Sequence, residues 1–424
     1  MSRWPLSRLK FLASAPIKNG LGEKGEFDDP SWPRYIRTTD IASPTSLRDD
    51  TFKSLPFAVA KDAMLSSGDI LMTAAGATIG KSFRFTDSYP ACFAGYLVRF
   101  RPDEHKVNGR FVAYWMQSAT YWAQVDAQRV KSTIENFSAS RYQGLEVPVP
   151  PLPTQRAIAD YLDTETARID ALIEKKRRMV ALLEERRMSA MTEGVSGQMT
   201  EDATRPSTLP WISECGATWK EARLTLVARQ GTGHTPSREH PEWWVDCNIP
   251  WITTGEVAQV RSDRVEVIDE TREKISLLGT ANSSAEVHPA GTVVLCRTAS
   301  AGYSAIMGSD MATSQDFATW TCGPLLRPRF LLLCLRAMRQ DLLGRLAMGS
   351  THKTIYMPDI GALRIPLPDT DTQDRIIDVV EKALGYVNAT TDVLARQIDL
   401  LVERRQALIT AAVTGELTIP GVAA

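Results

Sequence analysis

Two stretches that repeat one another 218 residues apart decide the fold of this chain. The first is VPVPPLPTQRAIADYLDTETARIDALIEKKRRMVALLEERRMSAMTEGVSGQM at 147–199, and the second is IPLPDTDTQDRIIDVVEKALGYVNATTDVLARQIDLLVERRQALITAAVTGEL at 365–417. They align without a gap, and 16 of the 53 aligned positions are identical. Because a long internal repeat organises a whole chain, we interpret the order as globular part, helical part, globular part, helical part.

Apolar residues in both stretches recur at spacings that alternate between three and four, as in the heptad of a coiled coil. Prolines precede both patterns, and Thr154 or Thr372 can cap the first turn of the helix that follows. Gly197 or Gly415 comes after the last turn of each predicted helix, as is usual at a helix end. We predict a first helix from about residue 155 to about 193, roughly 55 to 60 Å long at 1.5 Å per residue. The predicted seam consists of Leu162, Ile169, Ile173, Val180 and Leu183, and in the second helix of Val380, Leu384, Val387, Leu394, Ile398, Leu401 and Leu408.

Periodicity alone favours a structural hairpin or a coiled coil that binds a partner. Two such helices with a globular part between them would, if packed antiparallel, carry the globular parts to opposite ends around an approximate twofold axis. We therefore predict an α+β fold of two α/β-type domains joined and spaced by two long antiparallel coiled-coil helices. The predicted domains are 1–150 and 201–366, and the predicted helical regions are 151–200 and 367–424.

The globular parts repeat more loosely than the helices. Residues 35–41 (YIRTTDI) resemble 251–257 (WITTGEV), and GDIL at 68–71 resembles GTVV at 291–294. Each of the latter is a turn followed by a short apolar strand and a loop rich in small residues. Helices are predicted at 108–126 and 327–346. The helical segments align without a gap, whereas the globular segments are less similar to each other. This difference indicates one framework that carries two domains with different binding specificities.

Composition excludes several classes of protein. The net charge is −1, and no run of eighteen apolar residues or N-terminal signal is present, so we expect a cytoplasmic protein without a membrane span. The cysteines form no C-x-x-C pair, which argues against a zinc ribbon or a disulfide framework. They are Cys92, Cys215, Cys247, Cys296, Cys322 and Cys334. His234, His240 and Cys247 match no zinc-finger spacing, so we assign no metal.

Several segments together resemble a known family. GTGHTPSREHPEWW at 231–244, followed by IPWITTGEV at 249–257, resembles the opening of a target recognition domain in Type I restriction-modification specificity subunits. GATIGKS at 76–82 resembles a strand-end loop of another such domain, and the two proline-rich helix starts resemble that family's helix-start motif. The resemblance covers the whole chain. The chain departs from the pattern in the first domain, which lacks a Thr-Pro-Ser entry, and at Asp369 and Asp371, which replace prolines.

The resemblance implies a non-catalytic subunit that reads two short, different DNA half-sites separated by an unread spacer. It also implies two methylation subunits, which use S-adenosylmethionine to methylate adenine, and restriction subunits driven by ATP with Mg²⁺. No cofactor is expected on this chain itself. The charged helix segments 175–178, 184–187 and 403–405 are candidate docking sites, although a solvated helix face would look the same.

Polar loop residues are the candidates for contacts with double-stranded DNA, because bases are distinguished by donors and acceptors in the major groove. In the first domain they are Arg37, Thr38, Lys81, Arg129, Lys131, Ser132 and Thr133; in the second they are Thr253, Thr254, Arg297, Thr298, Tyr303, His352 and Lys353. For each of them a plain surface or loop-capping role is an equal alternative.

Two other functions remain open from the residues alone. One is a coiled-coil scaffold that organises partners without reading DNA, and the other is an enzyme that uses the loop at 76–82. GATIGKS is not a P-loop, because Ala75 stands where the first glycine is required. We find no Asn-Pro-Pro-aromatic loop of an adenine methyltransferase and no carboxylate and lysine cluster of a nuclease. The sequence therefore predicts no catalytic residue.

Overall fold

A computed structural model of the chain describes residues 3–128, 136–200, 203–349 and 353–420. The chain divides into two compact units. Unit 1 comprises Met1–Arg177 together with Arg396–Ala424, and unit 2 comprises Arg178–Ala395. Each unit therefore contains one globular part and a portion of each long helix. No helix among the described residues is long and apolar enough to cross a membrane.

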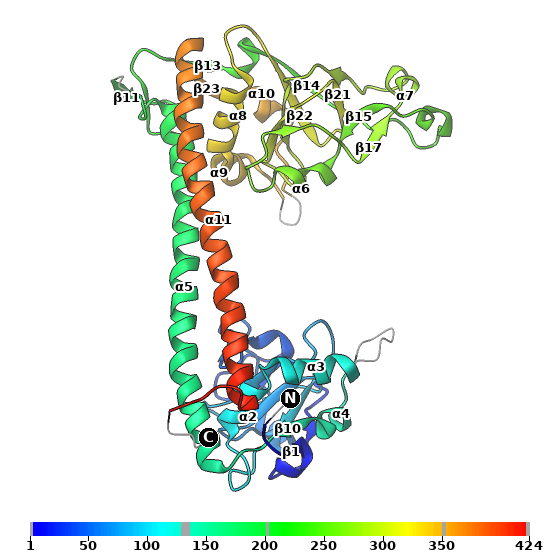
Figure 1. Ribbon diagram of the computed structural model, residues 1–424. Helices are drawn as coiled ribbons and strands as arrows, with labels where there is room; N and C mark the ends of the chain where they lie inside the picture. Colours follow the sequence, from blue (N-terminus) through cyan, green and yellow to red (C-terminus); the bar gives the residue numbers. More distant parts are fainter. Residues whose placement is uncertain (1–2, 129–135, 201–202, 350–352, 421–424) are drawn as a thin grey trace. The chain divides into compact units, whose positions relative to one another are not determined.

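The two long helices are α5 (Leu152–Ser196) and α11 (Thr370–Thr414), each of 45 residues and offset by the 218 residues of the repeat (Figure 1). Inside unit 1 they run antiparallel: Arg405 Nε lies 2.8 Å from Asp170 Oδ1, and Lys176 Nζ donates to Gln397 Oε1 at 2.6 Å. Inside unit 2 a Cβ added at Gly194 would collide with Val380. The two helices thus approach closely in unit 2, where glycine leaves room for valine.

The helix starts differ from the predicted ones. α5 begins before Thr154, and α11 begins before Thr372, so neither threonine is an N-cap. Asp369 caps α11 instead, because its carboxylate accepts hydrogen bonds from Thr372 N at 2.8 Å and Thr372 Oγ1 at 3.0 Å. The equivalent position before α5 is Pro151. Proline has no side-chain acceptor, so the start of α5 lacks the side-chain cap that Asp369 gives to α11.

The seam side chains of both helices lie inward. Leu162 and Val380 are fully buried, and the other predicted seam positions are buried or half-buried. A buried glutamine then ties each helix to its domain. In unit 1, Gln155 accepts a hydrogen bond from Asn108 N at 2.7 Å and donates one to Pro150 O at 2.7 Å. In unit 2, Gln373 likewise accepts from Arg327 N at 2.8 Å and donates to Pro368 O at 2.9 Å. The glutamine of each repeat copy therefore makes equivalent hydrogen bonds with its own domain.

The domain of unit 1 contains a four-stranded antiparallel sheet in the order β2-β9-β6-β7. Beside it, β3 (Arg34–Ile36) and β8 (Ala91–Phe93) form a parallel pair, and β1 (Leu6–Arg8) pairs with β10 (Glu146–Pro148) next to the start of α5. The strands of the sheet are β2 (Lys18–Asn19), β9 (Leu97–Phe100), β6 (Ile70–Thr73) and β7 (Ser82–Arg84).

The domain of unit 2 has the same framework, with one more strand in its main sheet and two more beside its parallel pair. Its main sheet has the order β14-β22-β19-β20-β16, so that β16 (Val267–Ile268) covers an edge equivalent to the β7 edge of unit 1. A second sheet has the order β17-β15-β21-β18, and β13 (Lys220–Arg223) pairs with β23 (Arg364–Leu367). The remaining strands are β14 (Ala228–Thr232), β22 (Phe317–Cys322), β19 (Val293–Cys296), β20 (Ser304–Met307), β17 (Glu273–Ile275), β15 (Ile249–Ile252), β21 (Met311–Thr313) and β18 (Val287–His288).

The short helices are less continuous than predicted. The single helix predicted at 108–126 is two, α2 (Gly109–Trp115) and α3 (Ala119–Gln128), and the prediction of one helix at 327–346 is also wrong. There α8 (Pro328–Ala337) is followed by α9 (Arg339–Asp341) and a π-helical turn at Leu342–Leu346. Ser118 explains the first break: its Oγ donates to Trp115 O at 2.7 Å and accepts from Tyr121 N at 3.3 Å, so it ends one helix and starts the next.

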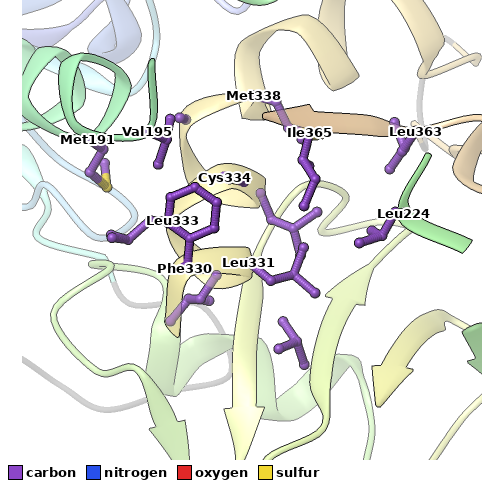
Figure 2. Packing of buried hydrophobic residues seen from close by; sticks show 14 of the residues in the cluster. Met191, Val195, Leu224, Phe330, Leu331, Leu333, Cys334, Met338, Leu363 and Ile365 are labelled. Atoms are coloured by element: carbon purple, nitrogen blue, oxygen red, sulfur yellow. The ribbon is translucent and has the colours of Figure 1, made fainter. Parts of the chain in front are cut away.

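The core of each unit joins the domain to the helix pair. Figure 2 shows this core in unit 2, where Phe330, Leu333 and Cys334 of α8 lie near Met191 and Val195 of α5. In unit 1 a core of the same kind combines Phe111 and Trp115 of α2 with Leu162 of α5 and Val413 of α11. Because close packing resists small displacements, the domain in each unit is held firmly on the helices that it contacts.

Candidate nucleic-acid interface

In unit 2 the polar loops gather at one edge of the domain. β15 and β21 are parallel with Ile252 opposite Thr313, so the residues after both strands leave the same edge. Ser314 N donates to Ile252 O at 2.9 Å, which places Thr253 and Thr254 beside Ser314. Because the carboxyl ends of parallel strands end together, two polar loops from distant parts of the sequence lie side by side.

The loop after β19 joins the same cluster. Arg297 N donates to Asp316 O at 2.8 Å, and Arg297 Nε donates to Gln315 O at 2.9 Å. Thr298 forms a bridge with Thr354, which brings in the segment at 353–355. Thr235 Oγ1 donates to Gln315 Oε1 at 2.6 Å and adds the start of the GTGHTPS segment. Five loops thus present hydroxyl, amide, guanidinium and ammonium groups at one edge of unit 2.

Unit 1 has an equivalent edge, formed by the equivalent parallel strands β3 and β8. Ile36 lies opposite Phe93 in the parallel pair, and Ala94 N donates to Ile36 O at 2.9 Å. Ala75 bridges Asn136 as Thr298 bridges Thr354 in unit 2. The side chains differ, however, because small residues at 74–76 replace the Arg297 and Thr298 of unit 2. Each unit therefore carries one loop cluster on a common frame, with its own set of donors and acceptors.

Arg37 and Thr38 begin the loop after β3. The Arg37 guanidinium donates to both carboxylate oxygens of buried Asp40, at 2.8 and 3.1 Å, and to Thr51 O at 2.7 Å. Most of its donor groups are thus used to hold this turn. Thr38 is half-buried at the start of a short 3₁₀ turn, Thr38–Asp40. These contacts give Arg37 a structural role, and its contact with DNA stays a prediction.

Lys81 and Tyr303 occupy equivalent positions. Lys81 O accepts a hydrogen bond from Thr73 N at 2.9 Å, and Tyr303 O accepts the equivalent bond from Cys296 N at 2.8 Å. Lys81 follows Gly80 and Tyr303 follows Gly302, and both glycines have a positive φ. GATIGKS is therefore a tight turn. The Lys81 side chain is exposed beside Trp122. The ring of Tyr303 lies under the guanidinium of Arg339, whose Cζ is 4.5 Å from the ring centroid.

The remaining described candidates lie in the unit 2 cluster. Thr253, Thr254, Arg297 and Thr298 are half-buried, and Lys353 is exposed with Nζ donating to Leu343 O at 3.3 Å. The structure brings together Thr253, Thr254, Arg297, Thr298 and the backbone beside Lys353. Five predicted residues fall outside the described ranges: Arg129, Lys131, Ser132, Thr133 and His352.

Sequence reasoning missed two loop residues of the clusters. Tyr96, between β8 and β9, is 68% exposed, and its carbonyl accepts from Ala74 N at 2.8 Å. Gln315 lies in the equivalent loop between β21 and β22 and contacts both Thr235 and Arg297. The available signal was a short polar interruption between two apolar runs, ACFAGYLVRF in unit 1 and MATSQDFATW in unit 2.

No cluster of three potential metal ligands occurs among the residues that the structure describes. Comparison with known proteins then decides the family. Residues 13–180 and 217–398 both match the profile of the Type I restriction modification DNA specificity domain. The chain belongs to this family. The two matched segments are the two halves of the internal repeat, so the specificity domain occurs twice and the role of the chain is in DNA specificity.

Similar proteins include three specificity subunits of Type I restriction enzymes from Escherichia coli. The EcoKI subunit of strain K12 is 25% identical over 123 residues, covering 29% of this chain but only 26% of that subunit. The EcoR124I/EcoR124II subunit is 21% identical over 70% of this chain and 69% of its own length, and the EcoBI subunit is 21% identical over 78% and 70%. Specificity subunits are non-catalytic components, which agrees with the absence of a predicted catalytic residue.

Two solved structures share the fold of this specificity-domain chain. A chain from a study of complex assembly and conformational transition of the type I R-M system superimposes with a TM-score of 0.70 at 17% identity, covering 98% of both chains. The HsdS subunit from Thermoanaerobacter tengcongensis gives a TM-score of 0.53 at 17% identity, covering 98% of this chain and 97% of that one. These likenesses show an α+β fold with two specificity domains and two long antiparallel helices.

Proposed function

We propose that this chain is the DNA-reading subunit of a Type I restriction-modification complex in the cytoplasm. Each loop cluster reads one short half-site of double-stranded DNA, and the helices carry two methylation subunits and the restriction subunits. S-adenosylmethionine, ATP and Mg²⁺ then belong to those partners. The observation that carries the proposal is the pair of loop clusters, because the same strand ends support different polar side chains in the two units.

The chemistry of the clusters suits base recognition. Amide and guanidinium groups such as those of Gln315 and Arg297 can form paired hydrogen bonds with base edges in the major groove, and each good pair discriminates by about 1 to 3 kcal/mol. Threonine side chains offer a hydroxyl to a base or phosphate and a methyl group to thymine. Since unit 1 presents Tyr96 and small residues where unit 2 presents Asp316 and Arg297, the two half-sites should differ in sequence.

The helices offer a surface for partner subunits. In unit 2, Val379, Tyr386 and Val393 of α11 are 38, 74 and 47% exposed and follow one another at seven-residue spacing. Residues seven apart lie on one face of a helix, so these three form an apolar stripe in addition to the buried seam. Apolar stripes of this kind pack against partner helices. The stripe therefore supports the docking of a methylation subunit.

The decisive experiment is coexpression with the methylation subunit encoded nearby, followed by sequencing of host DNA for methylated adenine. We expect a single bipartite motif with an unread spacer. Replacing residues 220–367 by the equivalent segment of another specificity subunit should change one half of the motif only. A Tyr386→Arg variant should lose methylation and comigration with the methylation subunit while the purified chain keeps its melting temperature.

The matched control is Leu226→Arg, because Leu226 is 78% exposed in the domain of unit 2 and lies outside the α11 stripe. Absence of any motif from an intact complex that binds S-adenosylmethionine would reject DNA reading and leave a scaffold. A motif in which both halves change after replacement of one domain would reject the assignment of one half-site to each unit.

A further inference from the structure

Unit 1 contains a cleft that the reading of DNA does not use. Its volume is about 710 Å³, and it lies between the hairpin at 43–45, the end of β7, helix α2 and the two long helices. Pockets of about 300 to 1,000 Å³ are typical of sites for small molecules. The cleft therefore has room for a ligand of nucleotide size.

Two of the arginines in its walls form ion pairs with aspartates. Arg110 contacts Asp163 at 2.6 Å and Asp160 at 2.7 Å, and Arg405 contacts Asp170 at 2.8 Å. Arg84 differs, because its Nε is buried and has no hydrogen-bond partner among the described residues, and no ion pair joins it to a described carboxylate. Burial lowers the pKa of its guanidinium, against the opposing charge of Glu104. A partly desolvated cation without a partner is costly unless a bound anion compensates it.

At the equivalent place in unit 2 the strand has an additional neighbour. Arg84 lies opposite Ile70 in its sheet, and Ile306 lies opposite Val293, the residue equivalent to Ile70. Ile306 is in turn paired with Val267 of the neighbouring strand β16. Glu266, the residue before β16, contacts Arg329 at 2.8 Å. Isoleucine in a strand that has neighbours on both sides thus occupies the position that unit 1 gives to an unpaired arginine beside a cleft, which indicates that Arg84 is not required by the fold.

We propose that this cleft binds a small phosphate-bearing molecule through the guanidinium of Arg84. Phosphate oxygens match the planar fork of a guanidinium and form two parallel hydrogen bonds with it. The hydroxyls of Thr45 and Thr86 line the same cleft and can donate to the remaining oxygens. The site is independent of the proposed reading of DNA, since none of these residues belongs to the loop clusters.

The test is calorimetric titration of the purified full-length chain with ADP and, separately, with inorganic pyrophosphate. We expect saturable binding of one ADP per chain, with affinity about tenfold or more lower in Arg84→Ile because a charge-assisted hydrogen bond is lost. Arg84→Lys keeps the charge without the fork and should give an intermediate affinity. Arg156→Ile is the matched control, because Arg156 is an exposed arginine of unit 1 outside the cleft.

Folding of each variant is checked by circular dichroism and melting temperature, and Arg84→Ile should fold because isoleucine occupies the equivalent position in unit 2. A wild-type chain that binds neither probe, or an Arg84→Ile chain that binds ADP as the wild type does, would overturn the proposal. A short random DNA duplex added in excess separates the two sources of phosphate. Unchanged ADP affinity supports a small ligand. Competition by the duplex, together with weaker duplex binding by Arg84→Ile, would assign Arg84 to the DNA backbone instead.

Discussion

The junction between the edge of the main sheet and the long helices is open in unit 1, and in unit 2 it is closed by an additional strand, β16. In unit 1 it contains the cleft and the unpaired Arg84. In unit 2 the segment at 260–268 contacts α11 through Arg264 and Asp392, and Arg336, which is fully buried, donates to Asp263 O and Val265 O at 2.8 Å each. Arg339 forms a bidentate pair with the Asp263 carboxylate at 2.6 Å. Arg336 therefore has two backbone acceptors and a nearby carboxylate, although its Nε makes no hydrogen bond, whereas the guanidinium of Arg84 has no hydrogen bond or ion pair with the described residues.

This comparison shows which features the two units share and which differ between them. Arg110 with Asp163 in unit 1 corresponds to Arg329 with Glu381 in unit 2, so the ion pair between domain and helix is repeated. What changes is the segment that connects β3 to β6 in unit 1 and β15 to β19 in unit 2. Because surface insertions are tolerated more easily than changes in a packed core, the repeat could diverge at the junction without losing its helices.

The largest expected effect is at the closed junction. Asp263→Asn removes the charge that Arg336 and Arg339 share while tolerating the positive φ of residue 263. Burial already lowers the pKa of Arg336 to about 10, so it stays charged near neutral pH and would then lack a carboxylate. We expect unit 2 to lose about 3 kcal/mol of unfolding free energy, measured by urea unfolding with hydrogen exchange to locate the effect.

The control for this variant is Asp392→Asn, which breaks the exposed contact with Arg264 in the same unit. Exposed pairs contribute less than about 1 kcal/mol. Equal losses from the two variants would show that the buried arginine network does not stabilise the closed junction.

The open junction should respond with the opposite sign. Arg84→Ile replaces an unpaired, partly desolvated guanidinium by the residue found at the equivalent position of unit 2. We expect a gain of about 1 kcal/mol in the stability of unit 1 in buffer without phosphate, seen as a higher midpoint in urea. A loss of stability would mean that Arg84 makes a structural contribution in the folded protein.

A smaller effect is expected from the ion pairs that the two units share. Arg110→Gln and Arg329→Gln should each cost less than about 1 kcal/mol, because these guanidinium groups are one third or more exposed to solvent. The Arg329 variant should lose more, since Glu266 is only 25% exposed. Thermal unfolding of both variants at low and high salt measures the difference, and the reverse order would contradict the comparison.

The smallest effect concerns the two helix starts. Hydrogen bonds from the backbone and side chain of Thr372 hold the pKa of Asp369 below its ordinary value of 3.8. A carboxylate with a lowered pKa contributes stability above its ordinary value and loses it as pH falls through the lowered one. Hydrogen exchange at the start of α11 should therefore be faster in Asp369→Ala than in the wild type at pH 5.

This difference should shrink below about pH 4, and the start of α5, where Pro151 replaces the aspartate, should show none. A difference that persists unchanged at pH 2.5 would mean that the ionised carboxylate is not what caps α11.

The sequence predicted the helices far better than the loops. A gapless repeat placed α5 and α11 within a few residues, because burial along one helix face leaves a periodic pattern in the sequence itself. The break at Ser118 was missed because a side-chain hydrogen bond to the local backbone interrupts a pattern that remains apolar on both sides. The cap at Asp369 was missed for a similar reason, since Thr372 also fits the capping preference.

The candidate interface was only partly predictable. Arg297 and Thr253 were found because each follows an apolar strand, but their neighbourhood depends on the pairing of β15 with β21, which are about 60 residues apart in the chain. The partner of Arg37 was also missed, although Asp40 is only three residues away. Whether an arginine faces a carboxylate or an open cleft, as Arg84 does, depends on strand pairing over long distances and leaves no periodic signal.

The division of unit 1 into two segments of the chain has a consequence for biosynthesis. The ribosome completes every residue of unit 2 by residue 395, so that unit can close its core while translation continues. Unit 1 is begun first but needs Ile409, Ala412, Val413 and Ile419 for its core. Until those residues emerge, the apolar face of its domain stays uncovered, and the part of the protein that is made first is the last to mature.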